Sequence, residues 1–182
     1  MACTLKHIKN SSANCAESYS GVGTSVYVAF VDKLAAKYDY ADDEAGFAEA
    51  SFAFTKDDPA AGWYQLDIKK KTGKVTAESN GPNKGFTNVL TFVLNNNMDS
   101  MAHISRAINN ADTLWAVADG KGSYYVIYDQ NFAPEVAISA DTGDAPDSDS
   151  GFTVTVTGTP MKYPLPKWTP AEGELEMAPD NE

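Results

Sequence analysis

Strict alternation of apolar and polar residues is the feature that most restricts what this chain can fold into. In the run FTVTVT, apolar residues alternate with Thr153, Thr155 and Thr157. Successive side chains of a β-strand point to opposite faces of a sheet, so this run predicts a strand with one buried face. Its other face is a row of threonines, which suits a wet channel as well as an ordinary solvated sheet surface.

The same period of two recurs along much of the chain. YQLDIKK (64–70) and KVTAES (74–79) alternate on either side of KKTGK, which predicts a hairpin, and FTNVLTFVLN (86–95) follows the turn NGPNKG. The run VYVAFV (26–31) is apolar at odd and even positions alike, which predicts a strand covered on both faces. Residues 35–50 break the pattern with acids, alanines and a glycine; they fit a long loop or a short surface helix, and we predict the loop.

Only NNNMDSMAHISRAINNAD (95–112) predicts a helix. Asn97 can cap it, Asp99 lies in its first turn, and apolar residues recur every three or four positions from Met101 to Ala111. Several short strands separated by Gly, Asp, Asn and Pro follow it. The chain is therefore expected to be mainly β, a two-sheet β-sandwich or barrel with one flanking α-helix.

The ends of the chain are expected to lie outside this β domain. Prolines and acidic residues gather after Pro160, and such a segment cannot build the interior of a sheet. We therefore predict an N-terminal arm at 1–20, a β domain at 21–160 and a Pro-rich acidic C-terminal arm at 161–182. An arm of this kind often reaches a neighbouring subunit.

Charge and composition narrow the classes of function. The formal net charge of −11 argues against a protein that grips nucleic acid, because phosphate binding needs clustered Lys and Arg. No apolar run approaches the roughly 20 residues of a membrane span, and no secretory signal is visible at the N-terminus. Two cysteines are too few for a disulfide scaffold, so we expect free thiols in a reducing cytoplasm.

The acidic segment SADTGDAPDSDS contains two patterns that resemble functional sites. Asp141-Thr142-Gly143 has the letters of an aspartic protease motif, but an apolar-apolar-Gly segment that would support the catalytic aspartate is missing. The candidates for a calcium site are Asp141, Asp144, Asp147 and Asp149. EF-hand spacing and a closing Glu are absent, and a flexible acidic loop explains the same residues.

A third pattern has the ligand types of a zinc site. Cys3, His7 and Cys15 are close in sequence, but structural zinc requires four ligands, and His103 lies on the predicted helix. Phosphate-binding loops and nucleophile motifs are not found either. The sequence therefore predicts no enzyme, no catalytic residue, no metal and no cofactor.

The order of the elements resembles that of bacteriophage tail tube (major tail) proteins, particularly those of phages and prophages of gut Bacteroidetes. The resemblance covers most of residues 20–160 and includes GVGTSVYVAF, YQLDIKKKTGKVTAESNG, GFTNVLTFVLN, the single helix, YYVIYD and the closing GDAPDSDSGFTVTVTGTP. It implies hexameric rings whose inner strands close a barrel, and rings that stack into a tube. Genome would pass through the lumen without specific binding, and the protein would be assembled in the bacterial cytoplasm into the virion tail.

The resemblance assigns residues to two surfaces. The expected lumen residues are Asp67, Thr76, Glu78, Thr153, Thr155 and Thr157. The expected contacts between subunits or rings are Lys69, Lys70, Lys71, Tyr38, Tyr40 and Trp168. Other tail proteins would be further partners, and the sequence does not separate contractile from non-contractile tails. Two alternatives remain: a secreted or surface β-sandwich that binds carbohydrate or protein, and a contractile injection-system tube or a related tail terminator.

Overall fold

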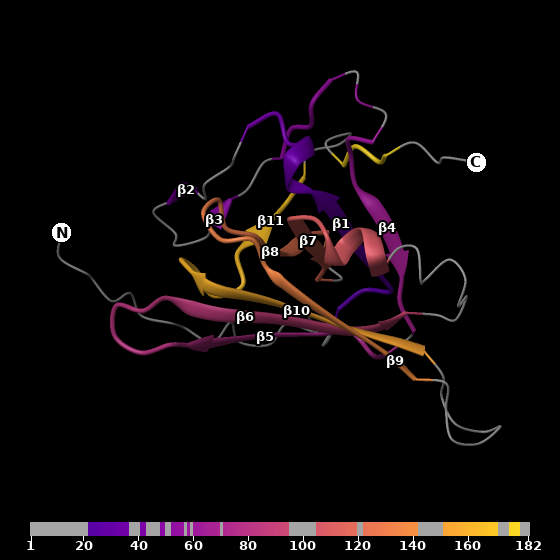
Figure 1. Ribbon diagram of the computed structural model, residues 1–182. Coiled ribbons are helices and arrows are strands. Elements are labelled where there is room, and N and C mark those ends of the chain that lie inside the picture. The colour runs from indigo at the N-terminus through magenta and orange to yellow at the C-terminus, as the bar shows by residue number, and fades with distance from the viewer. Residues whose placement is uncertain are drawn as a thin grey trace, which may run out of the picture.

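The protein is a sandwich of two β-sheets with a short helical segment beside them (Figure 1). The computed structural model describes residues 22–36, 41–42, 48–49, 52–56, 58, 60–69, 71–94, 105–119, 122–141, 151–170 and 175–178. The described strands form two separate sheets and do not close a barrel. The mainly β, two-sheet fold expected from the sequence is thus confirmed, and of the two expected architectures, sandwich or barrel, the described chain forms the sandwich.

The larger sheet has seven strands. In spatial order they are β2 (Ala41–Asp42), β3 (Ala48–Glu49), β11 (Lys167–Trp168), β8 (Tyr124–Ile127), β7 (Thr113–Ala118), β1 (Ser25–Phe30) and β4 (Tyr64–Asp67). Neighbouring strands are antiparallel except β11 and β3, which are parallel. A single 3-10 turn, η1 (Val31–Lys33), follows β1.

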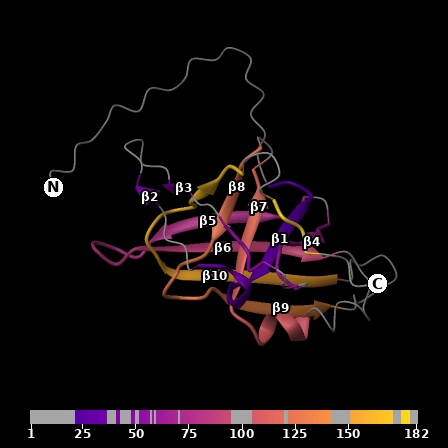
Figure 2. The same ribbon diagram turned by 90° about the horizontal axis from the view of Figure 1, so that it is seen from above.

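The smaller sheet has four antiparallel strands. In spatial order they are β5 (Lys74–Ser79), β6 (Phe86–Leu94), β10 (Gly151–Met161) and β9 (Glu135–Asp141). The strands of the larger sheet cross over them in the view from above (Figure 2). The helical segment at 105–109 lies beside β9, and Ile108 is buried as the helical periodicity predicts.

Two hydrophobic cores lie on opposite faces of the larger sheet. The first fills the space between the sheets and joins Val26 and Val28 of β1 to Phe92 of β6 and Val154 of β10. The second lies on the far face of the larger sheet and contains Ala29 of β1. Strand β1 is therefore covered on both faces, as its unbroken apolar run predicts.

The predicted hairpin between residues 64 and 79 is wrong. Strand β4 pairs with β1 in the larger sheet, whereas β5 pairs with β6 in the smaller sheet. The KKTGK segment is consequently a corner between the two sheets, where the Lys69 amide donates to the Val93 carbonyl at 2.8 Å. Both strands alternate correctly, but alternation does not identify the partner strand.

The predicted C-terminal arm is wrong for residues 161–170 and 175–178, which belong to the domain. Trp168 is fully buried in the second core, where its ring stacks on Trp63 with centroids 5.3 Å apart. Beside it, Lys167 Nζ lies 3.0 Å from Asp119 Oδ2, and this hydrogen bond raises the pKa of Lys167. The loop predicted at 35–50 likewise contains β2 and β3.

Candidate functional site

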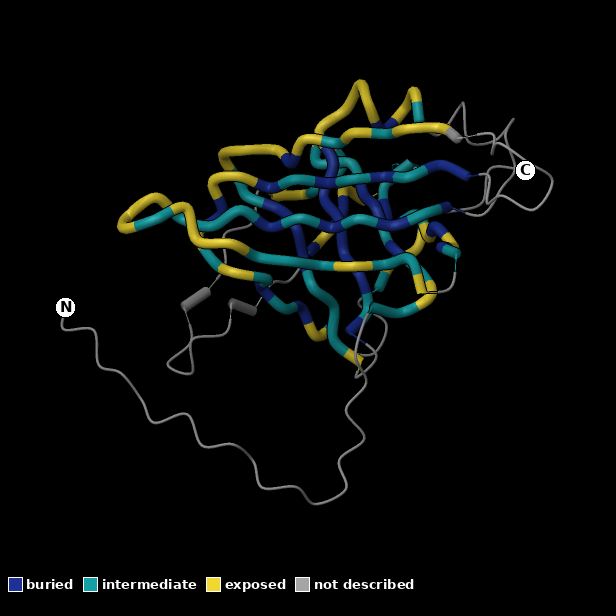
Figure 3. Tube along the Cα trace, turned by 90° about the horizontal axis from the view of Figure 1, so that it is seen from below, coloured by how far each residue is buried: buried dark blue, intermediate teal, exposed yellow. Residues whose placement is uncertain are grey.

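The outward surface of the four-stranded sheet, called here the threonine face, is a regular polar surface. Its register follows from two rungs that cross all four strands: Lys74, Thr91, Thr155 and Ala137, and then Thr76, Val89, Thr157 and Glu135. Burial alternates along β6 and β10 (Figure 3). The less buried residues of these rungs therefore lie on the face opposite the first core.

The threonine face carries little charge. The outward residues on these strands, apart from Asp141 and the part of β10 after Gly158 where the register shifts, are Lys74, Thr76, Glu78, Thr87, Val89, Thr91, Val93, Glu135, Ala137, Ser139, Thr153, Thr155 and Thr157. One is a lysine and two are glutamates, all on the outer strands β5 and β9. Its centre is therefore hydroxyl groups and small apolar groups, which give an anionic polymer no cationic contact.

Both edges of this sheet lack a described partner strand. β5 pairs only with β6 and β9 only with β10 among the described residues. An unpaired edge presents a row of backbone N–H and C=O groups that can pair with another chain. The open edges would allow this surface to continue from one copy of the chain to the next.

Five of the six residues expected to line a lumen lie on the threonine face, and Asp67 does not. It lies at the edge of the larger sheet, exposed on the side opposite the first core. Gln65 Nε2 and Ser25 Oγ each donate to its carboxylate at 3.0 Å, and these bonds lower the pKa of Asp67. Its grouping with the threonines is wrong, because β4 joined the other sheet.

The residues expected at contacts between copies have different outcomes. Lys69 and Lys71 lie at the corner between the sheets, where Lys71 has a positive φ of 67°. Tyr38, Tyr40 and Lys70 are outside the described residues. The prediction for Trp168 is wrong, since its side chain is fully buried within its own chain.

The metal candidates remain predictions. Cys3, His7, Cys15, His103, Asp144, Asp147 and Asp149 lie outside the described residues, and Asp141 is described only as the end of β9. No group of three or more His, Cys, Asp or Glu side chains converges anywhere in the described part of the chain.

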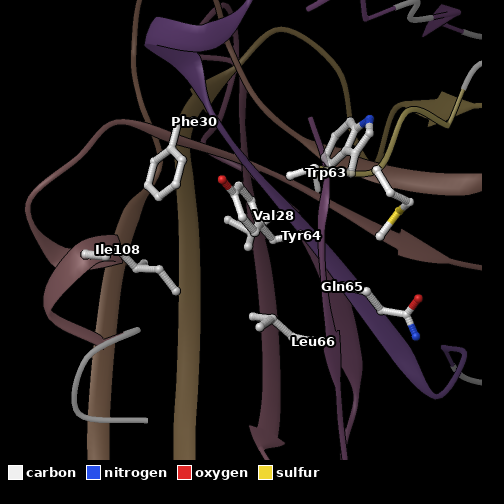
Figure 4. Close-up of a pocket in the computed structure, with 10 residues that line it drawn as sticks. Val28, Phe30, Trp63, Tyr64, Gln65, Leu66 and Ile108 are labelled. Carbon is white, nitrogen blue, oxygen red and sulfur yellow. The ribbon is translucent and has the colours of Figure 1, made fainter. Parts of the chain in front are cut away.

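A cavity of about 570 Å³ opens between the first core and the edge of the larger sheet (Figure 4). Phe30, Tyr64, Leu66 and Ile108 line it, so its wall is mainly apolar. The Tyr64 hydroxyl donates to the Ala60 carbonyl at 3.1 Å, and burial raises the pKa of Tyr64. Sequence patterns missed this cavity because β1, β4, the helical segment and residues 177–178 meet only in the folded chain.

Comparisons with known proteins give no relative for this chain: no family model, no curated protein and no solved structure matches it. Among the described residues, no helix has both the length and the hydropathy that a membrane span requires.

Proposed function

We propose that this protein is a structural subunit of a bacteriophage tail tube, in which hexameric rings stack into a channel for the genome. The observation that carries the proposal is the threonine face, a four-stranded polar surface with an open edge on each side. In a ring, β9 of one copy would pair with β5 of the next, and the threonine faces would line the lumen.

Ring closure of this kind would satisfy the backbone groups of both open edges. It would also remove the aggregation risk that exposed strand edges carry. The strand directions permit it: β5 and β9 lie at opposite edges of a sheet in which every neighbouring pair is antiparallel. Equivalent copies placed side by side would therefore continue the antiparallel pattern.

The chemistry of the threonine face supports passage of DNA without capture. Lysine and arginine contacts hold a phosphate backbone, and this face offers only Lys74, at its margin. The net charge of −11 also disfavours binding of the negatively charged DNA backbone. Under this proposal the partners are other copies and other tail proteins, and the location is the virion tail.

Engineered disulfides test the closure directly. Cysteine at Thr76 would be combined in turn with cysteine at Glu135, Ala137 or Ser139, after Cys3 and Cys15 are changed to serine. Within one copy β5 and β9 are three strand spacings apart, about 14 Å, which is too far for a disulfide. Oxidation should therefore give a ladder of covalent oligomers for the pair that lies in register, while single-cysteine variants stop at dimers.

Electron microscopy of the unmodified protein at rising concentration supplies the second readout. Rings or tubes with a central hole are expected, together with a rising mass in light scattering. Persistent monomers without cross-linked ladders would contradict the tail-tube proposal and favour a discrete β-sandwich binding module. Rings without ladders would contradict the β5–β9 contact.

A further inference from the structure

The tip of the β5–β6 hairpin contains an Asn-Gly pair in an exposed turn. Figure 1 shows this tip projecting at one end of the four-stranded sheet. The backbone N–H of Asn80 donates to the Gly85 carbonyl at 3.0 Å. Gly81 has a φ of +102°, a conformation that favours glycine. Apart from Gly81 and its two chain neighbours, no described residue has an atom within 4 Å of the position that a Cβ on Gly81 would occupy, so this side of the turn is open.

Three hydroxyl groups form hydrogen bonds with the Asn80 side-chain carboxamide and the backbone N–H of Gly81. Thr87 Oγ1 donates to Asn80 Oδ1 at 2.8 Å. Asn80 Nδ2 donates to Thr159 Oγ1 at 3.4 Å, and the Gly81 amide donates to Ser79 Oγ at 3.3 Å. If the Gly81 nitrogen attacked the Asn80 carboxamide, each hydroxyl would contact a different atom of that reaction. These atoms are the carbonyl oxygen Oδ1, the leaving nitrogen Nδ2 and the attacking Gly81 nitrogen.

We propose that Asn80-Gly81 is a self-modification site, at which the Gly81 nitrogen attacks the Asn80 side chain to form a cyclic imide. This inference does not depend on the tail-tube proposal. It rests on the three hydroxyl contacts and on the absence of a side chain at Gly81, so that no Cβ stands beside the attacking nitrogen.

The reaction balances with water as its only co-reactant. The Gly81 nitrogen forms a bond to Asn80 Cγ and loses its proton through Ser79 Oγ and solvent. The Thr87 hydroxyl stabilises the negative charge that develops on Asn80 Oδ1, in the manner of an oxyanion hole. The bond from Cγ to Nδ2 then breaks, and the nitrogen gains a proton and leaves as ammonia.

Water then opens the imide at one of its two carbonyl groups. Attack at the side-chain carbonyl gives aspartate, and attack at the main-chain carbonyl gives isoaspartate with one extra carbon in the backbone. Both products add a negative charge between Glu78 and Lys84. The hairpin tip would thus change its charge with the age of the protein.

Asn83 supplies an internal control in the same turn. It is exposed and has a positive φ of 60°, but it precedes Lys84, whose side chain crowds the attacking amide. The full-length protein would be incubated at neutral and mildly alkaline pH, and peptide mass spectrometry would follow both asparagines. We expect Asn80 to convert several-fold faster than Asn83, with an imide that hydroxylamine traps.

The Thr87→Val variant separates a structural site from an ordinary exposed Asn-Gly pair. It keeps the shape of the side chain and removes the donor, so conversion of Asn80 should slow several-fold in the folded protein. In denaturant the variant and the wild type should convert at equal rates. Conversion of Asn80 no faster than Asn83, or an unchanged rate in folded Thr87→Val, would overturn the proposal; if that variant fails to fold, Ser79→Ala gives the same comparison.

Discussion

The two sheets differ in how each of their faces is covered. The four-stranded sheet buries one face against the first core and leaves the threonine face outward, so burial alternates along its two central strands, and in β10 the apolar and threonine residues alternate with it. The central strands of the seven-stranded sheet, β1, β7 and β8, have buried residues on both faces, and their second cover comes from short segments far apart in the chain. The local sequence pattern therefore predicts the four-stranded sheet well and the seven-stranded sheet poorly.

The largest effect is expected where the second core depends on one distant residue. Trp168→Ala should destabilise the protein by about 3–5 kcal/mol, because a fully buried indole is replaced by a void beside Trp63 and Phe52. Chemical denaturation followed by circular dichroism measures the loss. A change below about 1 kcal/mol would mean that residues 167–168 contribute little to the second core.

Asn88 joins β6 to the segment between β10 and β11, and its loss should produce the next largest effect. Its buried side chain donates to the Tyr163 carbonyl at 2.9 Å and accepts from the Leu165 amide at 3.3 Å. Asn88→Ala removes the side-chain hydrogen bonds to the Tyr163 carbonyl and the Leu165 amide, in the segment that leads to β11. We expect the free energy of unfolding to fall by about 1–3 kcal/mol. Thr91→Ala, on the outward face of the same strand, is the matched control and should change stability much less.

The ion pair of Asp119 and Lys167 should contribute less, because Lys167 is partly exposed. Lys167→Met should lower stability by about 1–2 kcal/mol, since the Asp119 carboxylate stays buried without this cation. The folded-state pKa of Lys167 is raised, so its contribution is complete below the ordinary lysine pKa of 10.5 and disappears as pH rises through the folded value. Denaturation curves of wild type and variant should therefore converge only at strongly alkaline pH.

The smallest effect on stability is expected on the threonine face. Thr155→Val should change the free energy of unfolding by no more than about 0.5 kcal/mol, because its side chain points away from the first core. Thermal denaturation checks this, with Val154→Ala on the buried face of the same strand as the contrast. A large loss for Thr155→Val would show that the two faces of β10 are less distinct than their alternation implies.

Prediction from the sequence succeeded for features that depend only on the residues of a single strand. The alternation of residues 152–157 places the threonines outward, and the unbroken apolar run of β1 predicts cover on both faces. It failed at Asp67, whose strand alternates as expected but pairs with β1 rather than β5. It failed again at Trp168, because prolines and acids near a tryptophan do not reveal a pocket built by Phe52, Trp63 and Tyr124.

The sequence by itself determined which residues of each strand share a face, because a period of two is a property of neighbouring residues. Only the tertiary structure decided which strands pair, which buried faces meet, and which hydroxyls approach Asn80. Thr87 is seven residues from Asn80 and Thr159 is 79 residues away. Contacts of this kind depend on how whole sheets pack to bury their apolar faces, and no local pattern encodes that choice.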